Sequence, residues 1–213
     1  MDDVVTPTQR RGATTRQRIV TTAAELFHGR GYAATGLSHI LKRVRLTKGS
    51  FYHHFRSKKA VALAVIHEVV APTIQRRMID PVAGAKDPLA AVVKVMADIR
   101  THIATEALLT GCPLNNLATE LAVHDGDLQR AVASIFSAWE VAWTQAFHRA
   151  GRADARALSL SFMAAIEGAQ SIAKAVQRRD PLDVVFETFE RGGSLVTAAG
   201  PRRVAGKRRA ARP

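Results

Sequence analysis

The chain has one cysteine in 213 residues, no long run of apolar residues and no secretory signal pattern. A single cysteine excludes an intramolecular disulfide framework, which fits a reducing compartment. The lack of an apolar span argues against a helix that crosses a membrane. We therefore expect a cytoplasmic protein.

The residue sets that carry catalysis are also missing. The sequence has no phosphate-binding glycine loop, no metal-ligand spacing and no nucleophile with a base and an orienting group. We expect no enzymatic activity, no cofactor and no metal ion. The remote alternative is an all-helical enzyme that uses Cys112 together with His102.

Acidic residues are scarce at both ends of the chain. Residues 1–58 carry 11 Lys and Arg against 3 Asp and Glu, residues 201–213 carry 6 against none, and residues 59–200 carry 14 against 15. The formal net charge is +13. This distribution indicates a polyanionic partner for the two ends only. Double-stranded DNA is the partner we expect, and a membrane surface is the alternative.

Residues 35–59 predict two short helices joined by a tight turn. The first has apolar residues at helical spacing, and Thr35 is placed to cap its start. The second is capped by Thr47 and carries Phe51 and Phe55 on one face, so its other face is polar, aromatic and cationic. Such a pair is typical of the helix-turn-helix, whose second helix enters the DNA major groove.

The run Thr47-Lys48-Gly49-Ser50-Phe51-Tyr52-His53-His54-Phe55 resembles the signature of the TetR family of bacterial one-component repressors. Ser57-Lys58-Lys59 is similar to the opening of that family's next helix, and the stretch 15–31 is similar to its first helix. One position departs, because Arg45 stands where the family usually has glycine in the turn. If the backbone has positive φ there, Arg45 costs about 1 kcal/mol more than glycine; alternatively, Arg45 adds a phosphate contact.

The resemblance implies the DNA contacts residue by residue. Phosphate contacts are expected from Lys48, Tyr52, His54 and Lys58, and base-edge contacts from Ser38, Gly49, Ser50 and His53. Phosphate contacts set the register of the protein on DNA, and base contacts read the sequence. The alternative for Tyr52 and His54 is that they pack under neighbouring helices.

The whole chain is predicted to be all-α, with about nine helices. Residues 1–13 are expected to form a flexible basic arm, 14–56 the helix-turn-helix domain, 57–199 a ligand-binding and dimerisation domain, and 200–213 a disordered basic tail. Pro72 should kink or end the helix that starts near residue 57, Asp80-Pro81 and Gly84 mark a loop, and Pro113 begins a new helix. The tail either adds sequence-independent affinity for DNA or has no role.

In the family that the chain resembles, the last two helices form a four-helix dimer interface with their copy. We expect these helices over 154–178 and 182–198. Their interface candidates are Phe162, Ala165, Ile166, Ala169, Ile172, Ala173, Val185 and Phe189. The alternative is an ordinary intramolecular core.

Members of this family couple DNA affinity to a small ligand held in the larger domain. The candidate lining residues are Met96, Ile99, His102, Ile103, Cys112, Asn116, Leu117, Phe136, Trp139 and Trp143. Apolar walls with few polar points favour a hydrophobic or aromatic effector. An aromatic stripe at helical spacing can equally be plain core. Asn116 and Glu120 share a helix face, where they either line the cavity or pair locally.

Cys112 lies between Gly111 and Pro113 at an expected helix N-terminus, where the helix dipole and free N–H groups favour the thiolate. The segment resembles one in a TetR-type subgroup, some members of which respond to electrophiles or oxidants through this cysteine. The alternative is a buried, small apolar residue.

The sequence thus predicts a homodimeric transcriptional repressor that a small hydrophobic or reactive effector releases from a palindromic operator. The alternative within the DNA-binding class is an organiser or activator without a small-molecule ligand.

Overall fold

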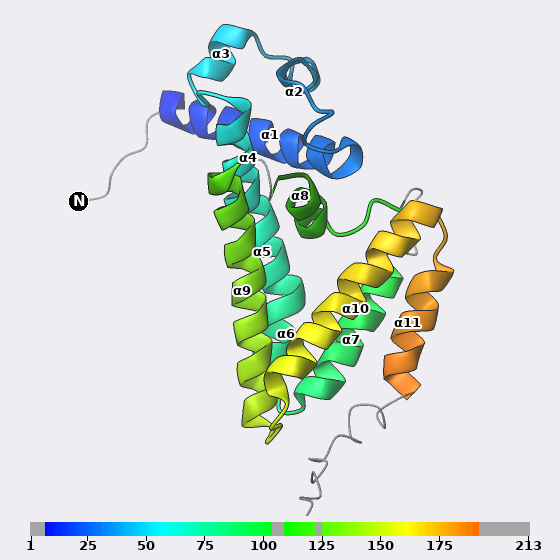
Figure 1. Ribbon diagram of the computed structural model, residues 1–213. Coiled ribbons are helices and arrows are strands. Elements are labelled where there is room, and N and C mark those ends of the chain that lie inside the picture. The colour runs from blue at the N-terminus through cyan, green and yellow to red at the C-terminus, as the bar shows by residue number, and fades with distance from the viewer. Residues whose placement is uncertain (1–6, 104–108, 122–124, 192–213) are drawn as a thin grey trace, which may run out of the picture.

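The computed structural model describes residues 7–103, 109–121 and 125–191, and every regular element within them is helical. If the continuous helical run over 58–83 is counted once, these residues form nine helices, which confirms the all-α prediction. Figure 1 shows α1–α3 gathered at one end, above a larger body that contains the other helices. None of the described helices is long and apolar enough to cross a bilayer.

The small end consists of α1 (Pro7–Arg30), α2 (Leu37–Val44) and α3 (Lys48–Tyr52). α1 begins at Pro7, so the second half of the segment expected to be a flexible arm is helical. Residues 1–6 lie outside the described part. The core of this end contains the fully buried side chains of Ile19, Val20, Ile40 and Phe51.

The cap expected at Thr35 is wrong. Thr35 is fully buried, and its hydroxyl donates to the carbonyl oxygens of Gly31 at 2.7 Å and Leu26 at 3.3 Å. The N-cap of α2 is Gly36, whose N–H donates to His39 Nδ1 at 3.1 Å. Because a buried hydroxyl needs an acceptor, Thr35 bonds backbone carbonyls in the last turns of α1 and just after it instead of capping α2.

A continuous helical run joins the small end to the larger body. It comprises α4 (Lys58–Val65), the π-helical η1 (Ile66–Val70), α5 (Ala71–Ile74), the π-helical η2 (Gln75–Ile79) and α6 (Asp80–Ala83). The helix does not end at Pro72, which was one of the two outcomes expected there, and the loop expected at Asp80-Pro81 is wrong, because the run continues to Ala83 and ends at Gly84. One residue separates each proline, Pro72 and Pro81, from the π-helical segment that precedes it. The wider turn in front of the ring removes the clash that would end an ordinary α-helix.

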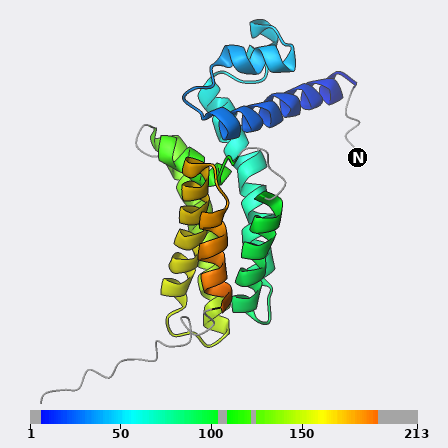
Figure 2. The same ribbon diagram turned by 90° about the vertical axis from the view of Figure 1, so that its right-hand side faces the viewer.

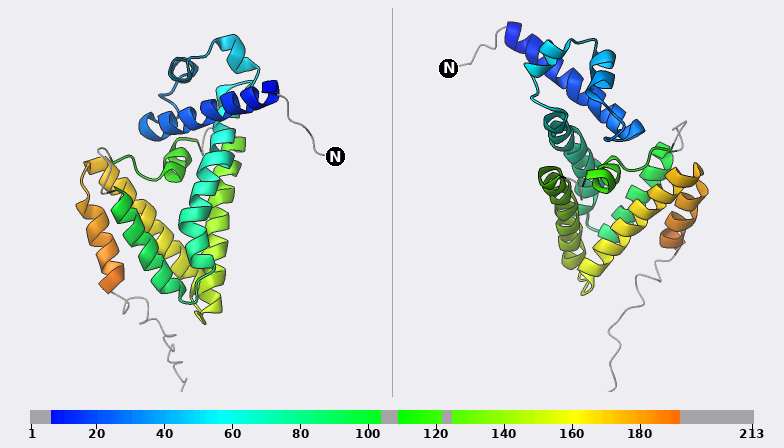
Figure 3. Two further views of the ribbon diagram at one scale, coloured as in Figure 1. Left: turned by 180° about the vertical axis from the view of Figure 1, so that it is seen from behind. Right: turned by 45° about the horizontal axis from the view of Figure 1, so that its top comes forward.

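The larger body also contains α7 (Pro88–Ile103), α8 (Pro113–Leu121), α9 (Gly126–Arg149), α10 (Ala155–Val176) and α11 (Asp180–Arg191). α8 begins at Pro113, as predicted. Figures 1 and 3 show α9 and α10 diverging from the turn that joins them, with the short α8 between their open end and α1, and Figure 2 shows α1–α3 at one end of the molecule from another side. α8 is thus placed to touch both parts of the molecule. Residues 104–108 and 192–198, expected to continue α7 and α11, lie outside the described part.

Candidate nucleic-acid interface and sensor cavity

The turn between α2 and α3 contains a residue in the left-handed conformation. Arg45 has φ 55° and ψ 50°, and the N–H groups of Arg45 and Leu46 both donate to the carbonyl oxygen of Leu41. The condition considered from the sequence, positive φ at Arg45, is therefore met, and the arginine costs about 1 kcal/mol more than glycine there. Arg45 is exposed, which keeps it a candidate for a phosphate contact.

α3 is capped and anchored as the sequence predicts. Thr47 is the N-cap, and its Oγ1 accepts from Ser50 N–H at 3.2 Å. Phe51 is fully buried and Phe55 nearly so, with ring centroids 6.0 Å apart. α3 ends at Tyr52, so Phe55 lies beyond the helix and not on its face as expected from the sequence. The buried Phe51 ring holds one face of α3 against the core, and the opposite face lies in solvent.

The outward face carries most of the predicted DNA contacts. Lys48, Gly49, Tyr52 and His53 are exposed, Ser50 and His54 are half-buried, and Ser38 on α2 is exposed. Tyr52 is 54% exposed and meets Phe51 edge-on at 5.5 Å. It does not pack under a neighbouring helix, so that alternative is wrong for Tyr52. Figure 1 shows α3 at the outer end of the molecule.

Lys58 is placed differently from the other predicted phosphate contacts. It is half-buried at the start of α4, and its Nζ lies 4.0 Å from the centre of the Tyr32 ring. Burial lowers the pKa of Lys58, and the negative charge of Glu120 opposes that effect. In this conformation the side chain packs at the junction of the two parts through a cation–π contact.

Two arginines fasten α1 to its neighbours. Arg16 forms a bidentate pair with Glu68 at 2.7 and 2.5 Å, and Arg18 Nη2 donates to Val44 O at 3.0 Å. The hydrogen bonds between Arg16 and Glu68 raise the pKa of Arg16 and lower that of Glu68. α1 is thereby tied both to the helical run over 58–83 and to the end of α2.

Glu120, near the end of α8, holds the loop that follows α1. Its Oε2 accepts from Ala33 N–H at 2.8 Å. Gly31, with φ 87°, leaves room for the carboxylate, because a Cβ there would lie 2.7 Å from Glu120 Oε1. Of the two roles considered for Glu120, cavity lining and local pairing, neither is correct. The residue contacts the helix-turn-helix domain instead.

Two further contacts cross the same junction. His28 Nε2, on α1, lies 2.8 Å from Gly111 O, and Lys59 Nζ lies 2.8 Å from Asp125 and 2.6 Å from Asp127. The hydrogen bonds between Lys59 and the two aspartates raise the pKa of Lys59 and lower the pKa of Asp125 and of Asp127. His28 therefore ties the segment before α8 to the DNA-binding end, and Lys59 ties the start of the 58–83 run to the start of α9.

A cavity of about 230 Å³, here called the sensor cavity, lies where α1, the 58–83 run, α7, α8 and α10 meet. Among the predicted lining residues it brings together Ile99, His102, Ile103 and Cys112. Arg77 and Gln170 also line it and were missed, because single polar residues on separate helices produce no periodic pattern. Leu117 lines a neighbouring cavity instead.

The predicted aromatic lining is wrong. Trp139 and Trp143 are fully buried, and neither these residues nor Met96 and Phe136 line the sensor cavity. Trp143 Nε1 donates to Met78 O at 2.7 Å. The rings of Phe136, Trp139 and Trp143 follow one another at 6.5 and 5.3 Å, so this stripe is packed core.

Asn116 does not line the sensor cavity either. Its Nδ2 donates to Thr110 O at 2.8 Å, and its Oδ1 accepts from Lys174 Nζ at 2.8 Å. Asn116 therefore fastens the loop before α8 to α10.

Cys112 is buried at the start of α8, where its carbonyl oxygen accepts from Asn116 N–H at 2.9 Å. Burial raises the pKa of its thiol well above the ordinary value, and the Glu167 carboxylate raises it further. The N–H groups of Asn115 and Leu114 lower the pKa by less. Desolvation therefore outweighs the stabilisation of the thiolate that was expected at the helix N-terminus, and the thiol is protonated at neutral pH.

Glu167, on α10, is a buried acid that the sequence did not reveal. Both carboxylate oxygens are inaccessible to solvent, and neither has a hydrogen-bond partner of normal geometry among the described residues. Burial raises its pKa to about 7, although the Cys112 thiol opposes this. A single glutamate among apolar residues on a helix gives no sequence signal that it faces inward.

The face expected for dimerisation is only partly free. Phe162, Ile166, Ala169 and Ala173 are buried within the chain's own core, and Ala165, Val185 and Phe189 are half-buried. For the four buried residues the alternative of an intramolecular core is correct. Ile172 is 52% exposed, and Val176 and Val184 on the same two helices are also exposed. Part of the face predicted for dimerisation is therefore occupied by the chain's own core.

Comparison with known proteins identifies the family. Residues 19–65 match the bacterial regulatory proteins of the tetR family, and residues 88–188 match the C-terminal domain of LmrA/YxaF-like transcriptional regulators. The transcriptional regulator AcuR of Cereibacter sphaeroides is 30% identical over 184 residues, which cover 82% of this chain and 83% of AcuR. The repressor NemR of Escherichia coli is 28% identical over 118 residues, 55% of this chain and 59% of NemR.

Solved structures agree with these matches. A regulatory protein TetR from Rhodobacter sphaeroides superposes with a TM-score of 0.72 at 30% identity, covering 82% of this chain and 96% of that protein. A TetR transcriptional regulator from Chloroflexus aurantiacus gives a TM-score of 0.76 at 29% identity, covering 85% and 95%. The relatives are regulators and not enzymes. The chain belongs to the TetR family of DNA-binding transcriptional regulators.

Proposed function

We propose that this protein is a cytoplasmic, homodimeric repressor that reads a palindromic operator and releases it when a small apolar effector fills the sensor cavity. The observation that carries this proposal is the position of α8. Cys112 and Pro113, at its start, line the sensor cavity, whereas Glu120, near its end, binds the backbone of the DNA-binding end at Ala33. A displacement of α8 by an effector therefore reaches the loop between α1 and α2 of the DNA-binding end within one short element.

The effector acts through two conformations of the dimer. It binds the one whose DNA-reading helices are wrongly spaced for the operator more tightly than the one that binds DNA. By linkage, operator DNA weakens effector binding by the same factor. The mostly apolar walls of the sensor cavity and the protonated thiol of Cys112 favour non-covalent binding of an apolar molecule.

The dimer forms through the exposed apolar face of α10 and α11, which carries Ile172, Val176 and Val184. A twofold dimer of a helix-turn-helix protein presents two reading helices to half-sites about one helical turn, ~34 Å, apart. The operator is therefore expected to be palindromic. In each half-site, Lys48, Arg45, Tyr52 and His54 approach phosphates, and Ser38, Gly49, Ser50 and His53 approach base edges.

This division of labour is tested with two variants of α3. Tyr52→Ala should weaken binding to specific and random DNA alike, because phosphate contacts carry no sequence information. His53→Ala should change the preferred base at one position per half-site. Equal loss on specific and random DNA for both variants, measured by fluorescence anisotropy, would contradict the assignment.

The sign of regulation is tested with a reporter gene whose promoter overlaps the selected operator. A repressor lowers expression of the reporter, and a panel of uncharged single-ring compounds should restore it. Raised expression would establish the alternative of an activator. Repression that no compound relieves, together with no compound-induced release of DNA from the purified protein, would favour an organiser without a ligand.

A further inference from the structure

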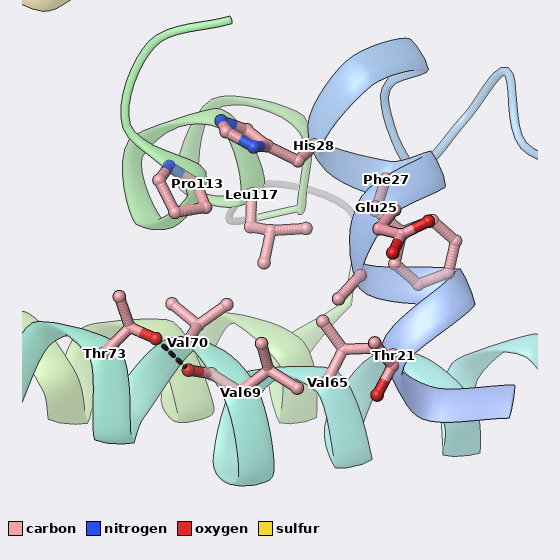
Figure 4. Close-up of a pocket in the computed structure, with 11 residues that line it drawn as sticks. Thr21, Glu25, Phe27, His28, Val65, Val69, Val70, Thr73, Pro113 and Leu117 are labelled. Atoms are coloured by element: carbon pink, nitrogen blue, oxygen red, sulfur yellow. Dashed lines mark hydrogen bonds between the residues drawn. The ribbon is translucent and has the colours of Figure 1, made fainter. Parts of the chain in front are cut away.

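A second cavity of about 230 Å³ lies at the junction between the two parts of the molecule. Figure 4 shows its walls, which come from three elements. Phe27 is on α1, Val65 and Val69 are on the 58–83 run, and Pro113 and Leu117 are on α8. We call it the junction cavity. It shares His28, Thr73 and Pro113 with the sensor cavity, so the two are neighbours with a common wall.

The chemistry of the walls limits what can bind. The surfaces that face the space are almost entirely apolar. Of the polar lining residues, Thr73 already donates its hydroxyl to Val69 O at 2.7 Å, His28 Nε2 lies 2.8 Å from Gly111 O, and Thr21 and Glu25 are exposed on the surface, where Glu25 Oε2 accepts from Arg43 Nη2 at 3.4 Å. An ionic ligand would lose its hydration against the apolar walls, and the polar groups inside are already paired. The occupant that fits is uncharged and apolar.

The size of the cavity sets the size of the occupant. An apolar protein cavity of about 150 Å³ accommodates benzene. The larger volume here accommodates one ring with one or two small substituents. We propose that the junction cavity is a second small-molecule site, separate from the sensor cavity, that takes an uncharged, single-ring apolar molecule.

The position of this site gives its occupant a direct effect on the DNA-binding end. α1 forms one wall and is fastened to α2 by the Arg18–Val44 hydrogen bond. A ligand that fills the space between α1 and the side chains of Val69 and Leu117 stabilises the position that the DNA-binding end has, in this structure, relative to the larger body. The shared wall at His28 and Pro113 couples its binding energetically to that of a ligand in the sensor cavity.

The test uses toluene as the probe and the full-length protein without DNA, so its outcome does not depend on the proposed repressor function. Methyl groups of valine, leucine and isoleucine are observed by NMR during a toluene titration. We expect saturable shifts of the Val65 and Leu117 methyl resonances. Val69→Phe and Ala24→Leu, which each fill the junction cavity, should abolish these shifts. Ile103→Phe, which fills the sensor cavity only, is the matched control and should retain them.

Circular dichroism confirms that each variant is folded, and two substitutions on different helices guard against the failure of either one. Shifts that increase linearly without saturation would overturn the proposal. It would also be overturned if the saturable shifts centred on Ile99 and Ile103 and vanished in Ile103→Phe, because toluene would then occupy the sensor cavity. If the wild-type protein bound no specific operator, the proposed function would be contradicted, but the toluene titration would still test the junction cavity.

Discussion

Replacing Glu167 with glutamine should make the stability of the protein less dependent on pH. Burial raises the pKa of this carboxyl from the ordinary 4.5 to about 7 in the folded protein. Below pH 4.5 the group is protonated in both the folded and unfolded states. Between pH 4.5 and 7 only the unfolded chain ionises, so the free energy of unfolding falls as the pH rises. Above pH 7 both states are ionised and the loss is complete.

The magnitude follows from the same pKa. The full loss is on the order of 3 kcal/mol, because each pKa unit corresponds to about 1.4 kcal/mol. Most of it, about 2 kcal/mol, should develop between pH 5 and pH 8. The glutamine side chain of the variant does not ionise. The difference between the free energies of unfolding of Glu167→Gln and the wild-type protein is measured at each pH. The change of this difference with pH isolates the titration of Glu167, because any constant cost of the buried amide is the same at every pH.

Urea denaturation followed by tryptophan fluorescence measures this quantity, since Trp139 and Trp143 are both fully buried and report on the core. Protein concentration is held constant, because the stability of a dimer depends on it. Glu25→Gln, which removes an exposed carboxylate, controls for the loss of one negative charge. If the variant and wild type differ by the same free energy at pH 5 and pH 8, then Glu167 is not a buried acid and the reasoning fails.

Three other predictions concern the turn, the thiol and the dimer. Arg45→Gly should stabilise the protein by about 1 kcal/mol, whereas Lys42→Gly inside α2 should destabilise it by a similar amount. If Arg45→Gly melted at the same temperature as the wild-type protein, the backbone at Arg45 would not be strained. Iodoacetamide should alkylate Cys112 much faster in urea than in the native protein, because only the thiolate reacts; rapid native alkylation, detected by mass spectrometry, would restore the reactive-cysteine hypothesis. Val184→Glu should yield monomers in light scattering and Val141→Glu on α9 should not, a contrast whose absence would place the dimer interface elsewhere.

The DNA-binding end was predictable because its determinants are local. The Thr47 cap and the burial of Phe51 and Phe55 follow from residues within a few positions of one another. Thr35 was assigned to the wrong helix end because its choice between a cap and a buried bond depends on α1.

The larger body was harder to predict because its key choices are made between helices. Pro72 reads as a helix break, yet a π-helical segment in front of it keeps the run intact. The tryptophans of α9 follow a periodicity that is the same for a cavity wall and for a packed core. Only the neighbouring helices decide between the two, and here they fill the space. The roles of Glu120 and Glu167 likewise depend on partners far away in the sequence.

The central claim is that a dimer reads DNA through the outward face of α3. The most direct test is selection of bound duplexes from a random DNA library by the purified protein at about 150 mM salt, where non-specific electrostatic attraction is partly screened. We expect a palindromic consensus whose half-sites are centred about one helical turn apart. Recovery of no consensus, with binding that follows only the salt concentration, would contradict it.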